Sequence, residues 1–295
     1  MKHAALIVNP FSSSVTESRV AEVEQALTVQ LELETVRTER RGHAVELARE
    51  AARQHDAVLV FSGDGVFNEV LNGIDRDVPL GFIPGGRTNV LSRALGSPRE
   101  PVAAARRIVE ALATGRTRRI SLGRVNDRRF GFAAGVGADA ELIRRVDERR
   151  RTHDGRLPGD LVVMGLLARQ LAERRGRYEP VLEVEGLGRA ALVLVANGDP
   201  YTYAGPFALH LVPDASFELG LDIAAPVAVT PRSFAAGALS ALRGRARPEF
   251  LSAHDVDRID IICDAPMPLQ ADGEDLGDIL EAHFECERAA VSILV

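Results

Sequence analysis

The sequence predicts an α/β N-terminal domain with a mostly parallel sheet, followed by a β-rich, sandwich-like C-terminal domain. Over the first 120 residues, apolar runs of strand length alternate with amphipathic helical segments, which is typical of a parallel sheet covered by helices. After about residue 120, short strand-like runs between turn residues dominate. The chain has 295 residues and is 46% hydrophobic, enough for two cores. We therefore expect domains at residues 1–120 and 121–295, with a last strand that could pack on either.

The predicted elements of the first domain alternate between strand and helix. Strands are expected at residues 4–8, 31–36, 57–61 and 79–83. Helices, whose apolar residues recur every three or four positions, are expected at residues 15–29, 43–54, 90–95 and 102–113, and in the segment carrying Phe67, Val70 and Leu71. Ligands of parallel sheets bind beyond the carboxyl ends of the strands. The loops after Val8, Phe61 and Ile83 are therefore the candidate binding loops.

The second domain shows a different pattern, in which short strands dominate. They are expected at residues 119–125, 181–184, 190–196, 207–212, 221–224, 259–263 and 291–295. Helices are expected at residues 139–150, 158–174 and 231–243. Many short strands with turn signals between them favour a sandwich or a curled antiparallel sheet.

The composition argues against several classes of function. The net charge is −6 and the isoelectric point is about 5.7, so we expect no nucleic-acid partner, which would need a basic face. Lys2 is the only lysine, which excludes the lysine of a Walker A loop. Cys263 and Cys286 do not form a C-x-x-C pair, so no zinc site or disulfide framework is predicted. A reduced, cytoplasmic setting follows.

The hydropathy pattern predicts no transmembrane segment. No apolar stretch approaches the roughly 20 residues that span a bilayer. If the protein acts on a lipid, we expect it to meet the membrane from outside, as a cytoplasmic protein that is peripheral at the membrane surface. The sequence leaves the formation of a homodimer open.

The most informative motif is Gly63-Asp64-Gly65, between an apolar strand and a helical segment. Glycines at such a junction let the backbone approach an anion, and the helix start directs N–H groups and partial positive charge at it. Asp64 could hold a metal ion or order a nucleotide. The alternative is an Asp-Gly hairpin turn, which the flanking strand and helix disfavour.

A second glycine turn, Pro84-Gly85-Gly86-Arg87-Thr88-Asn89, also follows a strand and precedes a helix. Thr88 or Asn89 could cap that helix, and a plain cap is as good an interpretation as a ligand role for this turn alone. Arg87 could clamp a phosphate or point at solvent. Two such turns at neighbouring strand ends strengthen each other as a phosphate site.

Three further segments each allow two interpretations. Asp272-Gly273-Glu274 is typical of a hairpin tip, but Glu274 could also accept a proton from a substrate hydroxyl. His43 is better explained as a helix-start residue than as a catalytic one. A run of arginines favours a solvated helix face over docking on anionic lipid headgroups: Arg144, Arg145, Arg149, Arg150, Arg151 and Arg156.

Together these motifs resemble, in order and over nearly the whole chain, the diacylglycerol kinase catalytic family, which includes bacterial lipid kinases and sphingosine kinases. The matching segments are Asn9-Pro10, Thr38 with Gly42-His43-Ala44, Gly63-Asp64-Gly65 with Asn68-Glu69-Val70, Pro84 to Asn89 with Arg93 and Leu95-Gly96, Asn197, Gly205-Pro206, Pro213-Asp214-Ala215 and Asp272-Gly273-Glu274.

The resemblance implies a two-domain, ATP- and magnesium-dependent lipid kinase with ATP in the cleft between the domains, acting in phospholipid biosynthesis on a lipid alcohol. It implies that Glu274 is the catalytic base and that Asp64 is both catalytic and the metal ligand. The implied nucleotide-side residues are Asn9, Thr38, Gly63, Gly65, Gly85, Gly86, Thr88 and Asn89. Phosphoryl transfer relies on positioning and charge neutralisation, which backbone N–H groups and Mg²⁺ supply without a lysine.

The sequence also departs from the family pattern at several positions. Ser62 stands in place of a glycine, Val66 in place of a threonine and Ser13 in place of a glycine. Val90 and Leu219 stand where many members carry aspartate, the latter at a structural magnesium site for which Glu218 could substitute. These departures keep open a degenerate, non-catalytic nucleotide- or lipid-binding protein. A less favoured alternative is an NAD kinase, which shares the Gly-Asp-Gly turn.

Overall fold

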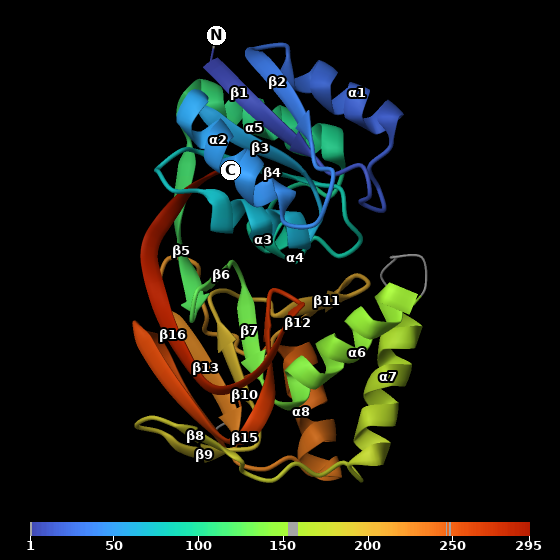
Figure 1. The fold of residues 1–295 in the computed structure, drawn as a ribbon, viewed down its shortest axis with the longest axis vertical. Helices are drawn as coiled ribbons and strands as arrows, with labels where there is room; N and C mark the ends of the chain where they lie inside the picture. Colours follow the sequence, from blue (N-terminus) through green and yellow to red (C-terminus); the bar gives the residue numbers. More distant parts are fainter. Residues whose placement is uncertain (1, 153–158, 246, 248) are drawn as a thin grey trace. The chain divides into compact units, whose positions relative to one another are not determined.

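The computed structural model describes residues 2–152, 159–245, 247 and 249–295. The chain divides into two compact units (Figure 1). The first comprises Met1–Leu122 together with Arg288–Val295, and the second comprises Gly123–Glu287. The last eight residues thus belong to the first unit.

The sheet of the first unit confirms the predicted parallel arrangement. Its strand order is β4-β3-β1-β2, and every pairing is parallel. The end of β16 (Glu274–Leu294) adds to its edge, where Ile293 pairs with Leu80 in parallel. The four strands are β1 (Lys2–Val8), β2 (Leu31–Arg37), β3 (Ala57–Ser62) and β4 (Leu80–Pro84). β3 and β4 are buried along their whole length, because helices cover both faces of such a sheet.

Five helices accompany these strands: α1 (Glu17–Leu27), α2 (His43–Gln54), α3 (Asp64–Gly73), α4 (Val90–Ala94) and α5 (Pro101–Thr114). α1 and α5 pack on each other and on the β1 and β3 residues of one core cluster. α2 and α3 contact each other and β3. The helix bounds lie within about two residues of the predicted ones, since apolar periodicity fixes a helix well and its ends poorly.

The second unit is built on an antiparallel sheet with the order β14-β13-β10-β7-β15-β16. Its helices are α6 (Ala138–Thr152), α7 (Asp160–Glu173) and α8 (Pro231–Arg243). The remaining strands are β5 (Thr117–Val125), β6 (Arg128–Phe130), β7 (Ala133–Val136), β8 (Leu182–Val184), β9 (Gly188–Ala190), β10 (Val193–Ala196), β11 (Thr202–Ala204), β12 (Phe207–Leu209), β13 (Leu221–Pro226), β14 (Phe250–Val256) and β15 (Arg258–Ala271). The predicted strand-rich second half is confirmed.

The core of the second unit is formed by inward-facing residues of these strands. Phe130 and Phe284 are fully buried in it and meet edge to face, with ring centroids 6.2 Å apart and an interplanar angle of 80°. Such aromatic pairs add stability beyond the area that they bury. The hairpin β5–β6 is thereby fixed to β16.

Several predicted strands of the second half differ in extent. The expected strand at residues 259–263 runs on to Ala271, and the one at 291–295 begins at Glu274. β15 keeps its pairing across register shifts, and a bulged strand of this kind has no simple alternation to detect. The predicted strand at 190–196 is two strands, because β9 pairs with β8 while β10 pairs with β7 and β13.

Four strands of the second half were not predicted at all: β6, β7, β11 and β14. β7 (Ala133–Val136) is a four-residue run that contains glycine and small side chains, which carry little β-propensity.

In the part of the chain that the structure describes, no helix combines the length and the apolar character needed to cross a membrane.

Candidate functional site

The candidate binding loops lie at one edge of the first unit's sheet. In register, Val8 pairs with Arg37 and with Phe61, and Ser62 pairs with Pro84. The strands therefore end side by side, as the parallel order requires. The predicted residues that follow these ends are thereby brought together: Asn9, Thr38, Gly63, Asp64, Gly65, Gly85, Gly86, Thr88 and Asn89.

The two glycine turns touch through their backbones. The Gly85 N–H donates to the Ser62 carbonyl at 2.6 Å. A Cβ placed on Gly86 would lie 2.6 Å from the Gly63 Cα, and a Cβ on Gly63 would lie 3.0 Å from the Gly86 Cα. No larger residue fits at either position without moving backbone. By contrast, a Cβ on Gly65 would meet no atom within 4 Å, so the chain itself does not require glycine there.

Asp64 joins the two turns through its carboxylate. It is the first residue of α3, and its Oδ1 accepts the Leu91 N–H at 3.1 Å, near the start of α4. A carboxylate at a helix N-terminus is favoured by the helix dipole. The acidic group of the first turn is therefore held against the second turn.

Of the two residues that could cap α4, Asn89 takes the N-cap position. It is in the left-handed conformation (φ 51°), but its side chain makes no cap bond. Its Oδ1 instead accepts the Gly86 N–H at 2.9 Å, and its Nδ2 donates to the Gly86 carbonyl at 2.7 Å. Thr88 uses its carbonyl, which accepts from the Arg93 guanidinium at 3.3 Å. The Asn89 side chain therefore bonds the backbone of its own turn. Asparagine suits this position because it tolerates a left-handed backbone and its side chain readily hydrogen-bonds nearby backbone groups.

The loop after β1 is tied to the first turn. The Asn9 Oδ1 accepts the Phe11 N–H at 3.0 Å, and the Ser12 and Ser62 hydroxyls are 2.8 Å apart. Ser62 is fully buried. The serine in place of the family's glycine therefore joins two loops through its hydroxyl.

Glu69, on α3, has a capping role that the sequence did not reveal. Its Oε1 accepts the Gly42 N–H at 2.9 Å and its Oε2 accepts the Ala44 N–H at 3.1 Å. Gly42, the N-cap of α2, has no side chain that could accept the first N–H groups of the helix. The Glu69 carboxylate, on α3, accepts them instead. The sequence signal available was a glycine at a predicted helix start, which has no side chain to cap the helix. His43 is the first residue of α2, as predicted.

The second unit carries Glu274 at a two-residue hairpin. β15 and β16 pair through Ala271 and Glu274, so Asp272 and Gly273 form the turn. Their φ angles are 48° and 77°, the positive values that a type I′ turn needs. The hairpin-tip interpretation is confirmed, and it places Glu274 at the first position of β16.

Asp272 anchors this turn to the start of β7. Its carboxylate accepts three backbone N–H groups, from Gly131 at 2.6 Å, Phe132 at 3.0 Å and Ala133 at 3.2 Å. Its own N–H donates to the Ala133 carbonyl at 2.8 Å. Asp272 is buried, so its charge is compensated entirely inside the protein.

Glu274 itself is paired with a cation. The Arg128 Nη2 donates to its Oε2 at 2.7 Å, and both side chains are 28% exposed. Arg128 lies on β6, in the hairpin fixed by the aromatic pair. The ion pair with Arg128 holds the Glu274 carboxylate in one position and leaves it partly accessible to solvent.

A buried polar cluster supports the same turn. The Gln270 Oε1 accepts the Gly273 N–H at 3.0 Å, and its Nε2 donates to the Asp139 Oδ2 at 2.8 Å. The Tyr201 hydroxyl donates to the Asp139 Oδ1 at 2.6 Å. Burial raises the pKa of Asp139, and burial together with this carboxylate raises the pKa of Tyr201 well above its usual value. A fully bonded network of this kind rigidifies its surroundings.

Near Leu219, where the resemblance implies a structural magnesium site, two carboxylates accept hydrogen bonds from the protein. The Gly220 N–H donates to Asp255 at 2.7 Å, while Glu218 accepts the Ser216 hydroxyl at 2.7 Å. Within the described residues, no group of three His, Cys, Asp or Glu side chains is placed to hold a metal ion. A magnesium ion bound through one carboxylate and substrate phosphates needs no such group, so Asp64 still fits that role.

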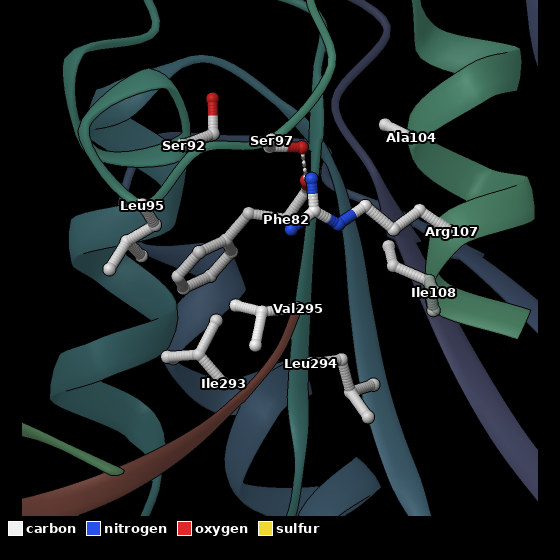
Figure 2. A pocket seen from close by; sticks show the side chains of 10 residues that line it. All are labelled: Phe82, Ser92, Leu95, Ser97, Ala104, Arg107, Ile108, Ile293, Leu294 and Val295. Carbon is white, nitrogen blue, oxygen red and sulfur yellow. Dashed lines mark hydrogen bonds between the residues drawn. The ribbon is translucent and has the colours of Figure 1, made fainter. Parts of the chain in front are cut away.

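A small cavity of the first unit lies apart from these loops. It has a volume of about 10 Å³ and lies between β4, α5 and the end of β16. Figure 2 shows Phe82, Arg107 and Ile293 among its lining side chains. The volume suits roughly one water molecule. None of the predicted site residues lines it, so it is a packing gap beside the C-terminus.

The chain is similar to known proteins along nearly its whole length. Residues 3–125 match the diacylglycerol kinase catalytic domain. A diacylglycerol kinase of Bacillus subtilis strain 168 is 32% identical over 293 residues, which cover 96% of this chain and 93% of that protein. A diacylglycerol kinase of Mycobacterium tuberculosis is 34% identical over 182 residues, covering 59% and 56% of the two chains.

Solved structures share the fold. A diacylglycerol kinase from Bacillus anthracis superposes with a TM-score of 0.74 at 19% identity, covering 99% of this chain and 96% of that chain. An NAD kinase from Archaeoglobus fulgidus in complex with ATP superposes with a TM-score of 0.54 at 14% identity, covering 99% and 93%. At these identities the likeness concerns the fold alone.

Proposed function

Since the chain belongs to the diacylglycerol kinase family, we propose that it is an ATP-dependent lipid kinase, which transfers the γ-phosphate of ATP to the hydroxyl of a lipid alcohol. The observation that carries the proposal is the pair of glycine turns whose backbones touch at the ends of β3 and β4. Asp64 lies at the start of α3 between them. A helix start with a carboxylate beside it supplies the partial positive charge and the metal ligand that phosphate binding uses.

On the nucleotide side, the chain would act by positioning. The open space above Gly65 lets a phosphate approach the backbone at the start of α3, where the helix dipole favours negative charge. Asp64 would hold Mg²⁺, which neutralises charge on the phosphates when bound. Asn9, Thr38, Thr88 and Asn89 would shape the walls of this site.

On the lipid side, Glu274 would accept the proton of the attacking hydroxyl. A general base needs a fixed position and a route to its substrate. The ion pair with Arg128 and the hydrogen bonds of Asp272 supply the fixed position, and the partial exposure supplies the access. The substrate would be a diacylglycerol-like lipid or a sphingoid base, used in phospholipid biosynthesis. The protein would meet it as a cytoplasmic enzyme at the membrane surface.

The direct test is transfer of label from γ-labelled ATP to a panel of lipid alcohols in mixed micelles, with products identified by mass. Diacylglycerol and a sphingoid base are the essential members, and magnesium is varied. Appearance of a phosphorylated lipid supports the proposal. A protein that binds ATP but labels no lipid would refute it, and formation of NADP from NAD and ATP would favour the NAD kinase alternative.

A substitution at Gly65 tests the nucleotide site without disturbing the fold. In Gly65→Ala the new methyl group meets no protein atom within 4 Å, so the free energy of unfolding should change by less than about 0.5 kcal/mol. If phosphate approaches the backbone there, the methyl group blocks it, and ATP affinity should fall at least about tenfold, or ~1.4 kcal/mol. Calorimetric titration with ATP and thermal unfolding measure the two effects.

The matched control is Gly165→Ala, since Gly165 is also a helical glycine with open space around it. It should leave ATP affinity unchanged. Wild-type ATP affinity in Gly65→Ala would mean that the nucleotide does not approach this turn.

A degenerate, non-catalytic protein is the second candidate, and one observation favours it. The Ser62 hydroxyl is used by Ser12, and Val66 presents a buried apolar side chain where the family has a hydroxyl. If the chain is active as it stands, the double variant Ser62→Gly, Val66→Thr should change kcat/KM by less than about tenfold. Lipid labelling that appears only in the double variant would establish the degenerate candidate instead.

A further inference from the structure

α8 (Pro231–Arg243) presents an unusual surface. Of its residues only Ala241 is buried, while Leu239 is 48% and Leu242 is 55% exposed. Surface leucines are common singly, but here they lie one turn apart on a single helix. Leu239 and Leu242 therefore form a solvent-exposed apolar stripe on this helix.

The charge of this helix has one sign only. Between Pro231 and Arg245 there is no aspartate or glutamate, although the whole chain has a net charge of −6. The helical period places Arg232, Leu239 and Arg243 on one face, at i, i+7 and i+11, and all three are exposed. The apolar stripe is thus bordered by cations.

The start of the helix is capped by its own residues, and its other end is bonded to the loop after β12. The Thr230 hydroxyl accepts the Ser233 N–H, and the Ser233 hydroxyl in turn accepts the Thr230 N–H. The Ala241 carbonyl accepts the His210 N–H at 2.8 Å, near the other end. Figure 1 shows the helix beside the strands of this unit.

We propose that the α8 face, defined as Arg232, Leu239, Leu242, Arg243 and Arg245, docks on the surface of a bilayer that contains anionic phospholipid. An amphipathic helix with arginines beside a leucine stripe inserts its apolar side chains between headgroups while the cations meet lipid phosphates. A second copy of this chain fits the face poorly, because two such faces would bring arginines together. This proposal rests on the proposed function, because an enzyme that phosphorylates a lipid must reach a bilayer to find its substrate.

The experiment measures binding rather than turnover. The full chain is co-sedimented with phosphatidylcholine vesicles and with vesicles that also contain phosphatidylglycerol. We expect binding to the anionic vesicles, and little to the neutral ones. Leu242→Asp should weaken it about tenfold, and Arg232→Gln or Arg243→Gln about fivefold each, since one arginine at an anionic surface contributes on the order of 1 kcal/mol.

Two matched controls isolate the face. Leu280 is also 55% exposed and lies on β16 of the same unit, so Leu280→Asp should bind as wild type does. Arg106→Gln, an exposed position on α5, should do the same. Equal loss in Leu242→Asp and Leu280→Asp overturns the proposal, as does self-association of the wild type that Leu242→Asp abolishes.

The proposal and the proposed function can fail separately. In micelles of an uncharged detergent, Leu242→Asp should phosphorylate lipid at the wild-type rate, because no anionic surface is needed there. If the protein binds anionic vesicles but labels no lipid, the docking proposal stands and the proposed kinase activity is refuted. Lipid labelling without preference for anionic vesicles refutes the docking face.

Discussion

Changing Glu274 to glutamine is expected to lower kcat for lipid phosphorylation by roughly a hundred- to ten-thousand-fold, the contribution of a general base. Glutamine has the same shape, and its amide oxygen can still accept from Arg128, which now donates to the Glu274 Oε2 at 2.7 Å. The Asp272-Gly273 turn before it keeps the hydrogen bonds of Asp272. ATP affinity and thermal stability should therefore stay close to wild type while turnover is lost.

Glu281→Gln is the matched control, since Glu281 lies on the same strand and its side chain is largely exposed. It removes the same charge and should leave kcat unchanged. Steady-state kinetics on a lipid that the wild type phosphorylates, with single-turnover measurements, separate chemistry from binding. If Glu274→Gln keeps more than about a tenth of wild-type kcat, the base lies elsewhere and the role of Glu274 is electrostatic or structural.

The first unit could be predicted nearly completely because its order is set locally. Each strand is a buried apolar run, each helix shows an amphipathic period, and the parallel order follows from their alternation. The predicted helix at 43–54 and the observed α2 (His43–Gln54) coincide. The convergence of Asn9, Gly63 and Gly85 also follows from topology alone, since parallel strands end at one edge.

The roles of the acidic residues could not be predicted, because their partners are remote in sequence. Glu69 accepts from Gly42, the N-cap of α2, 27 residues before it, and Asp64 accepts from Leu91, 27 residues after it. Asp272 accepts from Gly131, 141 residues away. A motif shows that such a carboxylate is present, but which backbone N–H groups it receives depends on the folded chain. The same holds for β15 and β16, whose register passes through bulges.

Replacing Asp272 with alanine is the change that we expect to destabilise the protein most. Three buried backbone N–H groups, from Gly131, Phe132 and Ala133, would lose their acceptor. A buried donor left unsatisfied costs about 1–3 kcal/mol. The backbone at Asp272 has a φ of 48°, which aspartate tolerates better than alanine does. The free energy of unfolding should therefore fall by about 4 kcal/mol or more, measured by denaturant titration.

Two variants separate the hydrogen bonds from the charge and from the turn. Asp127→Ala removes an exposed aspartate from the tip of the β5–β6 hairpin and should change the free energy of unfolding by less than about 0.5 kcal/mol. Asp272→Asn keeps one oxygen acceptor and tolerates the left-handed backbone, so it should lie between wild type and Asp272→Ala. Because Glu274 follows two residues later, the surviving folded fraction of Asp272→Ala should also lose kcat, as its carboxylate is no longer held. A stable Asp272→Ala protein with wild-type kcat would show that the β15–β16 pairing alone fixes the turn.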